Sequence, residues 1–424
     1  MTRPPNRRQF LKCAVGGGAW LALQGLGGIG CKRQSAPERA SRGPRYFVQI
    51  LLSGGHDTVY TTDPKERAEV DEDIALPTDN QFTETAGLRL GPHFRPLERW
   101  GPELSFLNGV QVGTANHETG FRQFLRLKTN ITQRMPSALD IIGANRDGQP
   151  LGVVYLNLGF GDLHSPGYLG TADAFYFGEK NLLDQAESAD PEQLLSLAKV
   201  LRRQAHSLRA RGASGREAIT AEHIDQAAAL FERMPHVEPF QPEHRSEDYT
   251  SQTMALSLQR AMWLIEHDLA RGIFIDAGLL GWDTHINNES RQGSMNGSFI
   301  RHFVRFLEEL EWTSNDRGRL VDQTAIVVGS DLGRFPKMND MLGKDHLPQT
   351  SFFFRGPSFA KGQSFGRTGG HMEALPISLS TGGSPASGGR IPILDDIGTT
   401  LLASAGLDPQ RYGYNGKLLE FLLA

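Results

Sequence analysis

The chain has 424 residues, 39% of them hydrophobic, and a formal net charge of -4 at pH 7. This length suits one large α/β domain, and the near-neutral charge, with no basic run after the N-terminal segment, argues against nucleic acid as a partner. The only two cysteines are Cys13 and Cys31, so we expect no disulfide, thiolate metal site or cysteine nucleophile in the folded domain.

The N-terminus has the features of an export signal. Residues 7–12 read Arg-Arg-Gln-Phe-Leu-Lys, the form of a twin-arginine signal, and a glycine-rich, weakly apolar stretch follows up to Ile29. This stretch is shorter than the about 20 apolar residues of a membrane-spanning helix. We therefore expect residues 1–30 to direct export and not to belong to the fold; the alternative is a chance arginine pair before an apolar patch.

A cysteine and a polar segment separate this signal from the domain. Cys31 is followed, up to Arg45, by residues rich in Arg, Ser, Ala and Pro, which is typical of a flexible tether over residues 31–45. A lipid on Cys31 would anchor the chain to a membrane, the one membrane contact we expect. The residues before Cys31 depart from the usual lipobox, so an outer-membrane lipoprotein and a free periplasmic protein are both open.

The domain expected over residues 46–424 begins with alternating strands and helices. Tyr46–Leu52 is a nearly continuous apolar run that ends at Ser53-Gly54-Gly55, a pattern typical of a strand buried on both faces of a parallel sheet. Two further strands are predicted over residues 104–112 and 153–158, with a helix over 118–127 between them. Charged amphipathic helices over 191–209 and 220–233 predict a helical insertion at about residues 190–248.

The C-terminal half has the clearest periodicity. Apolar residues at spacings of three and four predict one helix that ends at Gly272; they are Ala255, Leu258, Met262, Ile265 and Leu269. Strands are predicted over residues 273–280, 324–328 and 351–354, with a second striped helix over 299–310 and a closing helix over 393–405. Helix and strand alternate, which predicts a doubly wound, mostly parallel sheet flanked by helices.

Acidic and imidazole side chains follow the predicted strands or lie in the loop after residues 324–328. They are Asp57, Asp283, His285, Asp331 and His346. Because ligands bind beyond the carboxyl ends of the strands in such sheets, we expect these side chains to meet at one edge. Carboxylates and neutral imidazoles suit zinc, manganese or similar ions. Each residue also has a structural alternative, since an Asp after a strand often caps the next helix.

The same residues carry a resemblance to a known family. Gly281-Trp282-Asp283-Thr284-His285, Ser330-Asp331-Leu332-Gly333-Arg334 and Asp345-His346 resemble the GWDTH, SEFGR and DHG motifs of domain-of-unknown-function family 1501. The resemblance covers about residues 46 to 424. That family is grouped with the alkaline phosphatase superfamily, whose members hydrolyse phosphate or sulfate esters, often with two metals.

The resemblance implies an alkaline phosphatase-like fold and a small-molecule or polymeric ester substrate. It also implies one or two divalent ions (Zn, Mn, Ca or Mg). Carried over position by position, the ligands would be Asp57, Asp283, His285, Asp331 and His346.

Two positions depart from the superfamily pattern. Leu332 stands where many members have a second metal-binding histidine, and Asn116 stands where related sequences have a serine. An amide cannot form the covalent intermediate that a metal-activated hydroxyl forms. Thr114 or Thr119 could replace that hydroxyl only if the loop shifts. His117 is open as a ligand, a general acid or a polar loop residue, and Arg334 as an oxyanion binder or a member of a surface ion pair.

Two functions are therefore compatible with the sequence. One is an exported, metal-dependent hydrolase of phosphate or sulfate esters, using metal-activated water if no hydroxyl is available. The other is a binding or structural lipoprotein on the same scaffold without turnover, and in its extreme form without metal. The sequence gives no indication of the oligomeric state.

Overall fold

The computed structural model describes residues 43–131, 135–156, 174–176, 186–214, 216–243 and 249–424. The export signal expected over residues 1–30, Cys31 and the tether up to residue 42 lie outside these described residues. Within them, no helix combines the length and the hydropathy that crossing a bilayer requires.

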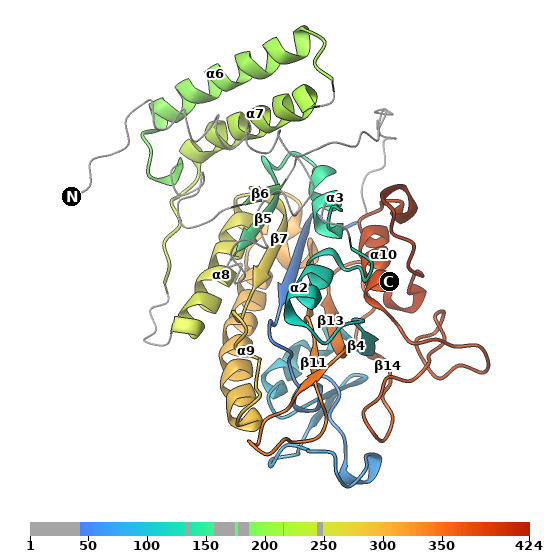
Figure 1. The fold of residues 1–424 in the computed structure, drawn as a ribbon. Coiled ribbons are helices and arrows are strands. Elements are labelled where there is room, and N and C mark those ends of the chain that lie inside the picture. The colour runs from blue at the N-terminus through green and yellow to red at the C-terminus, as the bar shows by residue number, and fades with distance from the viewer. Residues whose placement is uncertain (1–42, 132–134, 157–173, 177–185, 215, 244–248) are drawn as a thin grey trace.

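An eight-stranded sheet runs through the middle of the domain (Figure 1). Its strand order is β14-β4-β13-β10-β1-β7-β5-β6. The strands are β1 (Tyr46–Leu51), β4 (Leu104–Gln111), β5 (Leu151–Leu156), β6 (Ala174–Tyr176), β7 (Ala270–Asp276), β10 (Thr324–Gly329), β13 (Gln349–Arg355) and β14 (Gln363–Gly366). Within this sheet, β13 runs antiparallel to both of its neighbours and the other pairs are parallel. The mostly parallel α/β fold is thereby confirmed.

Helices cover both faces of this sheet, and each face has its own apolar core. The helices α8 (Tyr249–Glu266) and α9 (Asn288–Trp312) pack on one face, and α2 (His117–Arg126), α3 (Ala138–Ala144) and α10 (Leu394–Ser404) on the other. Alternate residues of β1 belong to the two cores, with Val48 and Ile50 in one and Phe47 and Leu51 in the other. This alternation is the reason that the whole strand reads as apolar.

The remaining helices and strands lie outside the three layers formed by this sheet and the helices on its two faces. The helices α6 (Pro191–Ala210) and α7 (Arg216–Arg233) pack against each other at one end of the molecule. The short strands β11 (Gly333–Arg334) and β12 (His346–Leu347) pair beyond the carboxyl end of β10, at the other end. Two further strand pairs are peripheral, β2 (Thr83–Thr85) with β3 (Leu88–Leu90) and β8 (Ser314–Asn315) with β9 (Gly318–Arg319).

The helix predicted to end at Gly272 ends earlier, at Glu266, and that prediction is wrong. Asp268 adopts a left-handed conformation with φ 53°, and Leu269 N donates to Leu264 O at 2.8 Å, so the chain turns as it does at a glycine-capped helix end. Gly272 instead lies inside β7, where a Cβ would come within 3.0 Å of Leu139 Cγ. Glycine at this position allows α3 to pack closely on the sheet.

The strand predicted over residues 273–280 is shifted toward the N-terminus, because the helix before it ends earlier than predicted. β7 starts at Ala270 and ends at Asp276. Residues 277–283 form a loop, in which Leu279 and Leu280 both have positive φ, 47° and 65°. This loop delivers Asp283 to the edge of the sheet.

Candidate metal centre

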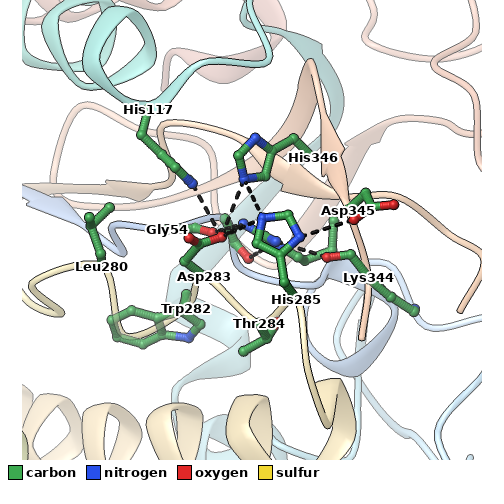
Figure 2. A network of polar contacts seen from close by, with 12 residues as sticks. Gly54, His117, Leu280, Trp282, Asp283, Thr284, His285, Lys344, Asp345 and His346 are labelled. Atoms are coloured by element: carbon green, nitrogen blue, oxygen red, sulfur yellow. Dashed lines mark hydrogen bonds and ion pairs between the residues drawn. The ribbon is translucent and has the colours of Figure 1, made fainter. Parts of the chain in front are cut away.

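Three histidines from separate parts of the chain surround one carboxylate at the carboxyl edge of the sheet (Figure 2). His117 opens α2, Asp283 and His285 follow β7, and His346 opens β12. The Nε2 atoms of His117, His285 and His346 lie 3.3, 3.2 and 3.2 Å from Asp283 Oδ1. The candidate ligand atoms of His117, Asp283 and His346 all lie within 4.8 Å of one another.

The second nitrogen of each imidazole is held by an oxygen acceptor. His117 Nδ1 lies 2.6 Å from Asp331 Oδ2 and His285 Nδ1 lies 3.0 Å from Asp345 Oδ1. His346 Nδ1 lies 2.7 Å from the carbonyl oxygen of Ala115. Carboxylate and carbonyl oxygens only accept hydrogen bonds, so each Nδ1 donates, and in a neutral ring the lone pair is then on Nε2. Metal-binding histidines are commonly fixed in this way.

The inward-facing nitrogens need a cation or a proton between them. His285 Nε2 and His346 Nε2 are only 2.9 Å apart, a distance at which two lone pairs repel. His117 Nε2 is buried and lies 3.3 Å from Asp283 Oδ1. An ion among the three nitrogens and the carboxylate would satisfy all four groups.

In the absence of a metal ion, protons on the imidazole rings reduce the repulsion between these nitrogens. Burial lowers the pKa of His117, but hydrogen bonds to Asp283 and Asp331 outweigh it and raise the pKa to about 9. Burial favours a higher pKa for Asp283. Hydrogen bonds from His117 and His346, together with the positive charge of Arg334, outweigh burial and hold that pKa well below its usual range. The cluster is therefore a strongly polarised group of side chains, in which a divalent ion would displace protons.

Arg334 lies beneath Asp283 with its side chain fully buried, 0% exposed. Its Nη2 donates to Asp283 Oδ1 at 2.8 Å and also to Gly54 O, its Nε to Gly55 O at 3.1 Å, and its Nη1 to Lys344 O at 2.9 Å. These bonds tie together the loops after β1, β7 and β10. The guanidinium has no exposed face for a substrate oxyanion, so we assign it to positioning Asp283.

Asp331 also lies behind the cluster and not in it. Its Oδ2 holds His117, and its Oδ1 accepts from Gly54 N at 2.9 Å. The residue is fully buried. The sequence interpretation gave Asp331 a ligand role and left His117 open; the structure places His117 in the cluster and Asp331 as the residue that orients it.

Asp57 is held by a different cation. Its Oδ2 lies 2.7 Å from Lys344 Nζ, with side-chain exposures of 3% and 0%, and accepts from Asn288 Nδ2 at 2.9 Å. Lys344 Nζ also donates to Ala75 O at 3.0 Å and lies 5.4 Å from the centre of the Tyr60 ring. The structure therefore does not bring Asp57 into the metal cluster. A lysine ammonium occupies the place beside it that the sequence interpretation assigned to a metal.

Asn116 and Thr114 build the turn that leads into α2. Asn116 Oδ1 accepts from Thr119 N at 3.0 Å, which caps the helix. Thr114 Oγ1 accepts from Asn116 N at 3.1 Å. In the part of the chain that the structure describes, no serine or threonine hydroxyl hydrogen-bonds to Asp283 or to the three cluster histidines. Thr114 therefore makes no hydrogen bond to the cluster, although the carbonyl of the next residue, Ala115, holds His346.

Two positioning residues were missed from the sequence. Ser53, which follows β1, donates from Oγ to Asp276 Oδ1 at 2.6 Å, and Leu280 N donates to Ser53 Oγ at 2.9 Å. Asp276 Oδ1 also accepts from Gly278 N at 3.1 Å. This bonding holds the loop that carries Asp283. The signal was an aspartate that directly follows the apolar run Ile273-Phe274-Ile275, but the strand prediction ran past it.

Comparison with known proteins gives one family and several distant structural similarities. A family model described as "Protein of unknown function (DUF1501)" matches residues 45–421. A search of curated proteins gives no match. The fold is similar to the PsFucS1 sulfatase from Pseudoalteromonas sp. (13% identity, TM-score 0.40, covering 99% of this chain and 76% of that one). It is also similar to the phosphonate monoester hydrolase of Agrobacterium radiobacter (13% identity, TM-score 0.39, covering 88% of this chain and 78% of that one). A third similar structure is the lipoteichoic acid synthase LtaP from Listeria monocytogenes (7% identity, TM-score 0.42, covering 89% of this chain and 74% of that one). Similarities this distant assign no activity.

Proposed function

The chain belongs to the family of proteins of unknown function DUF1501, and we propose that it hydrolyses phosphate or sulfate esters with one divalent metal ion. The ligands are His117, Asp283, His285 and His346. The observation that carries this proposal is the convergence of three Nε2 atoms on Asp283 Oδ1, at 3.2 to 3.3 Å, with every Nδ1 already held by an oxygen.

The donor set favours a transition metal. Three imidazole nitrogens and one carboxylate are the ligands of zinc and related ions, whereas calcium and magnesium take oxygen ligands. Among Zn, Mn, Ca and Mg we therefore propose Zn or Mn. One ion is favoured over two, because Asp57 is paired with Lys344 and Asp331 with His117.

The chemistry follows from the ligands and from what surrounds them. A divalent ion here supplies a Lewis acid and lowers the pKa of water, so a covalent intermediate on the chain is not required. Asp331 keeps His117 oriented, and Arg334 keeps Asp283 ionised and in place. His285 is the most open of the three histidines, 39% exposed against 13% for His117 and 22% for His346, so an ester approaches on its side.

A second candidate is a metal-binding protein without turnover. The use of Asn116 as a helix cap favours it, because this residue stands where related sequences have a hydroxyl. The two candidates share the metal centre and differ only in whether a bound ester is cleaved.

We also propose export by the twin-arginine route into the periplasm. The Arg7-Arg8 motif supports this. Cys31 supports a lipid-anchored form, and its poor lipobox supports a free one.

The test is metal content and turnover of the mature protein purified from the exporting cell. We expect about one Zn or Mn per chain by elemental analysis, and hydrolysis of p-nitrophenyl phosphate or sulfate. His346→Ala should lose both. The matched control is His371→Ala, which removes an exposed histidine that pairs with Asp71 and should change neither.

Each outcome decides between the candidates. Metal that is lost in His346→Ala, without turnover in the parent protein, would select the binding protein. A parent protein that takes up no metal from excess Zn or Mn would refute both candidates.

A further inference from the structure

Large hydrophobic side chains are exposed around the metal centre. Among the described residues, eight such side chains are exposed, and four of them lie in the two loops that carry or hold ligands. They are Ile286, Phe335, Met341 and Leu342, with exposures of 45%, 42%, 54% and 64%. We call these four side chains the apolar rim. Clustered exposed apolar groups commonly mark a binding site.

The apolar rim is continuous with the site through backbone contacts. Ile286 directly follows His285 and forms an antiparallel bridge with Leu342, while Asn287 N donates to Met341 O at 3.1 Å. Residues opposite each other in such a bridge have neighbouring side chains. Phe335 N donates at 2.6 Å to the carbonyl oxygen of Asp345, whose carboxylate holds His285. The apolar rim therefore borders the most open ligand.

Neither the backbone conformation of Leu342 nor the exposure of its side chain explains why a leucine stands at this position. Its φ is 56°, in the left-handed region that favours glycine or asparagine. Its side chain is also exposed, so it gains nothing from burial in the core. Leu280, which Figure 2 shows on the opposite side of Asp283 from Asp345, has the same kind of backbone, with φ 65°. Strained residues that persist beside a site commonly serve that site.

We infer that the apolar rim binds the hydrophobic part of the ester, so that the substrates are phosphate or sulfate esters of an alkyl or aryl alcohol. This inference rests on the proposed function. Four side chains are enough to cover one such group, but a stable protein interface takes about 20 to 30 residues a side. A small apolar group next to the scissile bond therefore fits this surface better than a second protein.

The test compares esters that differ only in chain length. Ethyl and octyl phosphate, and the corresponding sulfates, have leaving groups of nearly equal basicity, so a difference in kcat/KM reports contact with the alkyl chain. The rim variant combines Ile286→Thr, which keeps β-branching, with Leu342→Asn, which tolerates positive φ. The control is Val200→Thr, which removes an exposed apolar side chain from α6 at the other end of the molecule.

We expect the parent protein and the control to prefer the octyl ester by about tenfold or more, and the rim variant to lose most of that preference. The melting temperature of the rim variant should be unchanged or higher, because asparagine relieves the strain at position 342. A parent protein without chain-length preference, or a rim variant that retains it, would overturn the inference. The inference would also be overturned if sedimentation velocity showed that the rim variant had lost self-association while its chain-length preference was unchanged.

A binding measurement separates this inference from the proposed function. If no ester is cleaved, the Zn-loaded protein is titrated with octylphosphonate and ethylphosphonate in a calorimeter. Tighter binding of octylphosphonate that disappears in the rim variant would support the apolar rim even though hydrolysis has failed. Equal binding of the two phosphonates would contradict it.

Discussion

Asp331 and His117 form a pair in which the carboxylate fixes the imidazole. The 2.6 Å contact between Asp331 Oδ2 and His117 Nδ1 keeps the proton on Nδ1 and turns Nε2 toward Asp283. In Asp331→Asn the amide nitrogen can donate where the carboxylate accepted, which favours the wrong tautomer. We expect metal affinity to fall about 10- to 100-fold, as for other residues behind a ligand. Competition with a chelator of known affinity measures this.

The control for this variant is Asp63→Asn. Asp63 is also largely buried and pairs with Lys65 and Thr368, none of which contacts the cluster. Its substitution should leave metal affinity unchanged. An Asp331→Asn variant that binds metal as tightly as the control would show that Asp331 does not orient a ligand.

The raised pKa of His117 gives metal binding a defined pH dependence. In the metal-free protein the pKa rises from 6.5 to about 9. The stability from this proton is fully present below pH 6.5 and is lost as the pH rises through about 9. Metal binding must displace the same proton, so we expect affinity to strengthen over that window. Chelator competition at several pH values, paired with melting of the metal-free protein, measures both trends, and neither should be seen in His117→Ala.

At the scale of elements, the segment from Gly343 to β12 is anchored from beneath by Lys344. Its ammonium pairs with Asp57 in a fully buried contact, while the next two residues are Asp345 and His346. Lys344→Met leaves the Asp57 carboxylate buried without a cation, which typically costs about 3 to 5 kcal/mol of unfolding free energy. Urea unfolding of the metal-free protein should show a loss of that size.

The double variant Asp57→Asn/Lys344→Met removes both charges and serves as the reference. We expect it to recover much of the lost stability, because no unpaired charge remains buried. If Lys344→Met were as stable as the parent protein, the buried pair would not anchor this segment.

Periodicity predicted the elements but not all of their ends. The apolar stripes located α8 and α9, and the continuous runs located β1, β7 and β10. The end of α8 escaped prediction because Asp268 takes a left-handed conformation that usually signals glycine. The antiparallel direction of β13 was also not predictable, since strand direction depends on long-range pairing that one short apolar run does not encode.

Part of the site could be predicted from the position of its residues relative to the predicted strands. Asp283, His285 and His346 were selected because they follow strands whose carboxyl ends meet at one edge. Asp57 satisfies the same rule, yet its partner is Lys344, which is 287 positions away and is not distinguished by any local pattern. Distinguishing a ligand from a residue behind a ligand requires side-chain directions, which is also why the sequence did not separate the roles of Asp331 and His117.

At the scale of the whole molecule, the metal centre joins distant parts of the chain. Its groups come from α2, the loop after β7 and β12, and Arg334 adds the loop after β1. An ion that binds only the folded state stabilises all of these connections together, by about 2.7 kcal/mol at one hundred times the dissociation constant. We expect added Zn to raise the melting temperature of the metal-free protein, and a chelator to reverse the rise. Asp283→Ala should show neither effect.

The central claim, that three imidazole nitrogens and one carboxylate hold a single ion, is tested most directly by X-ray absorption spectroscopy of the Zn-loaded protein. We predict a first shell dominated by nitrogen at about 2.0 to 2.1 Å, with the multiple scattering of three imidazoles, reduced to two in His346→Ala. A shell of oxygen ligands, or imidazole scattering that does not change in His346→Ala, would contradict it.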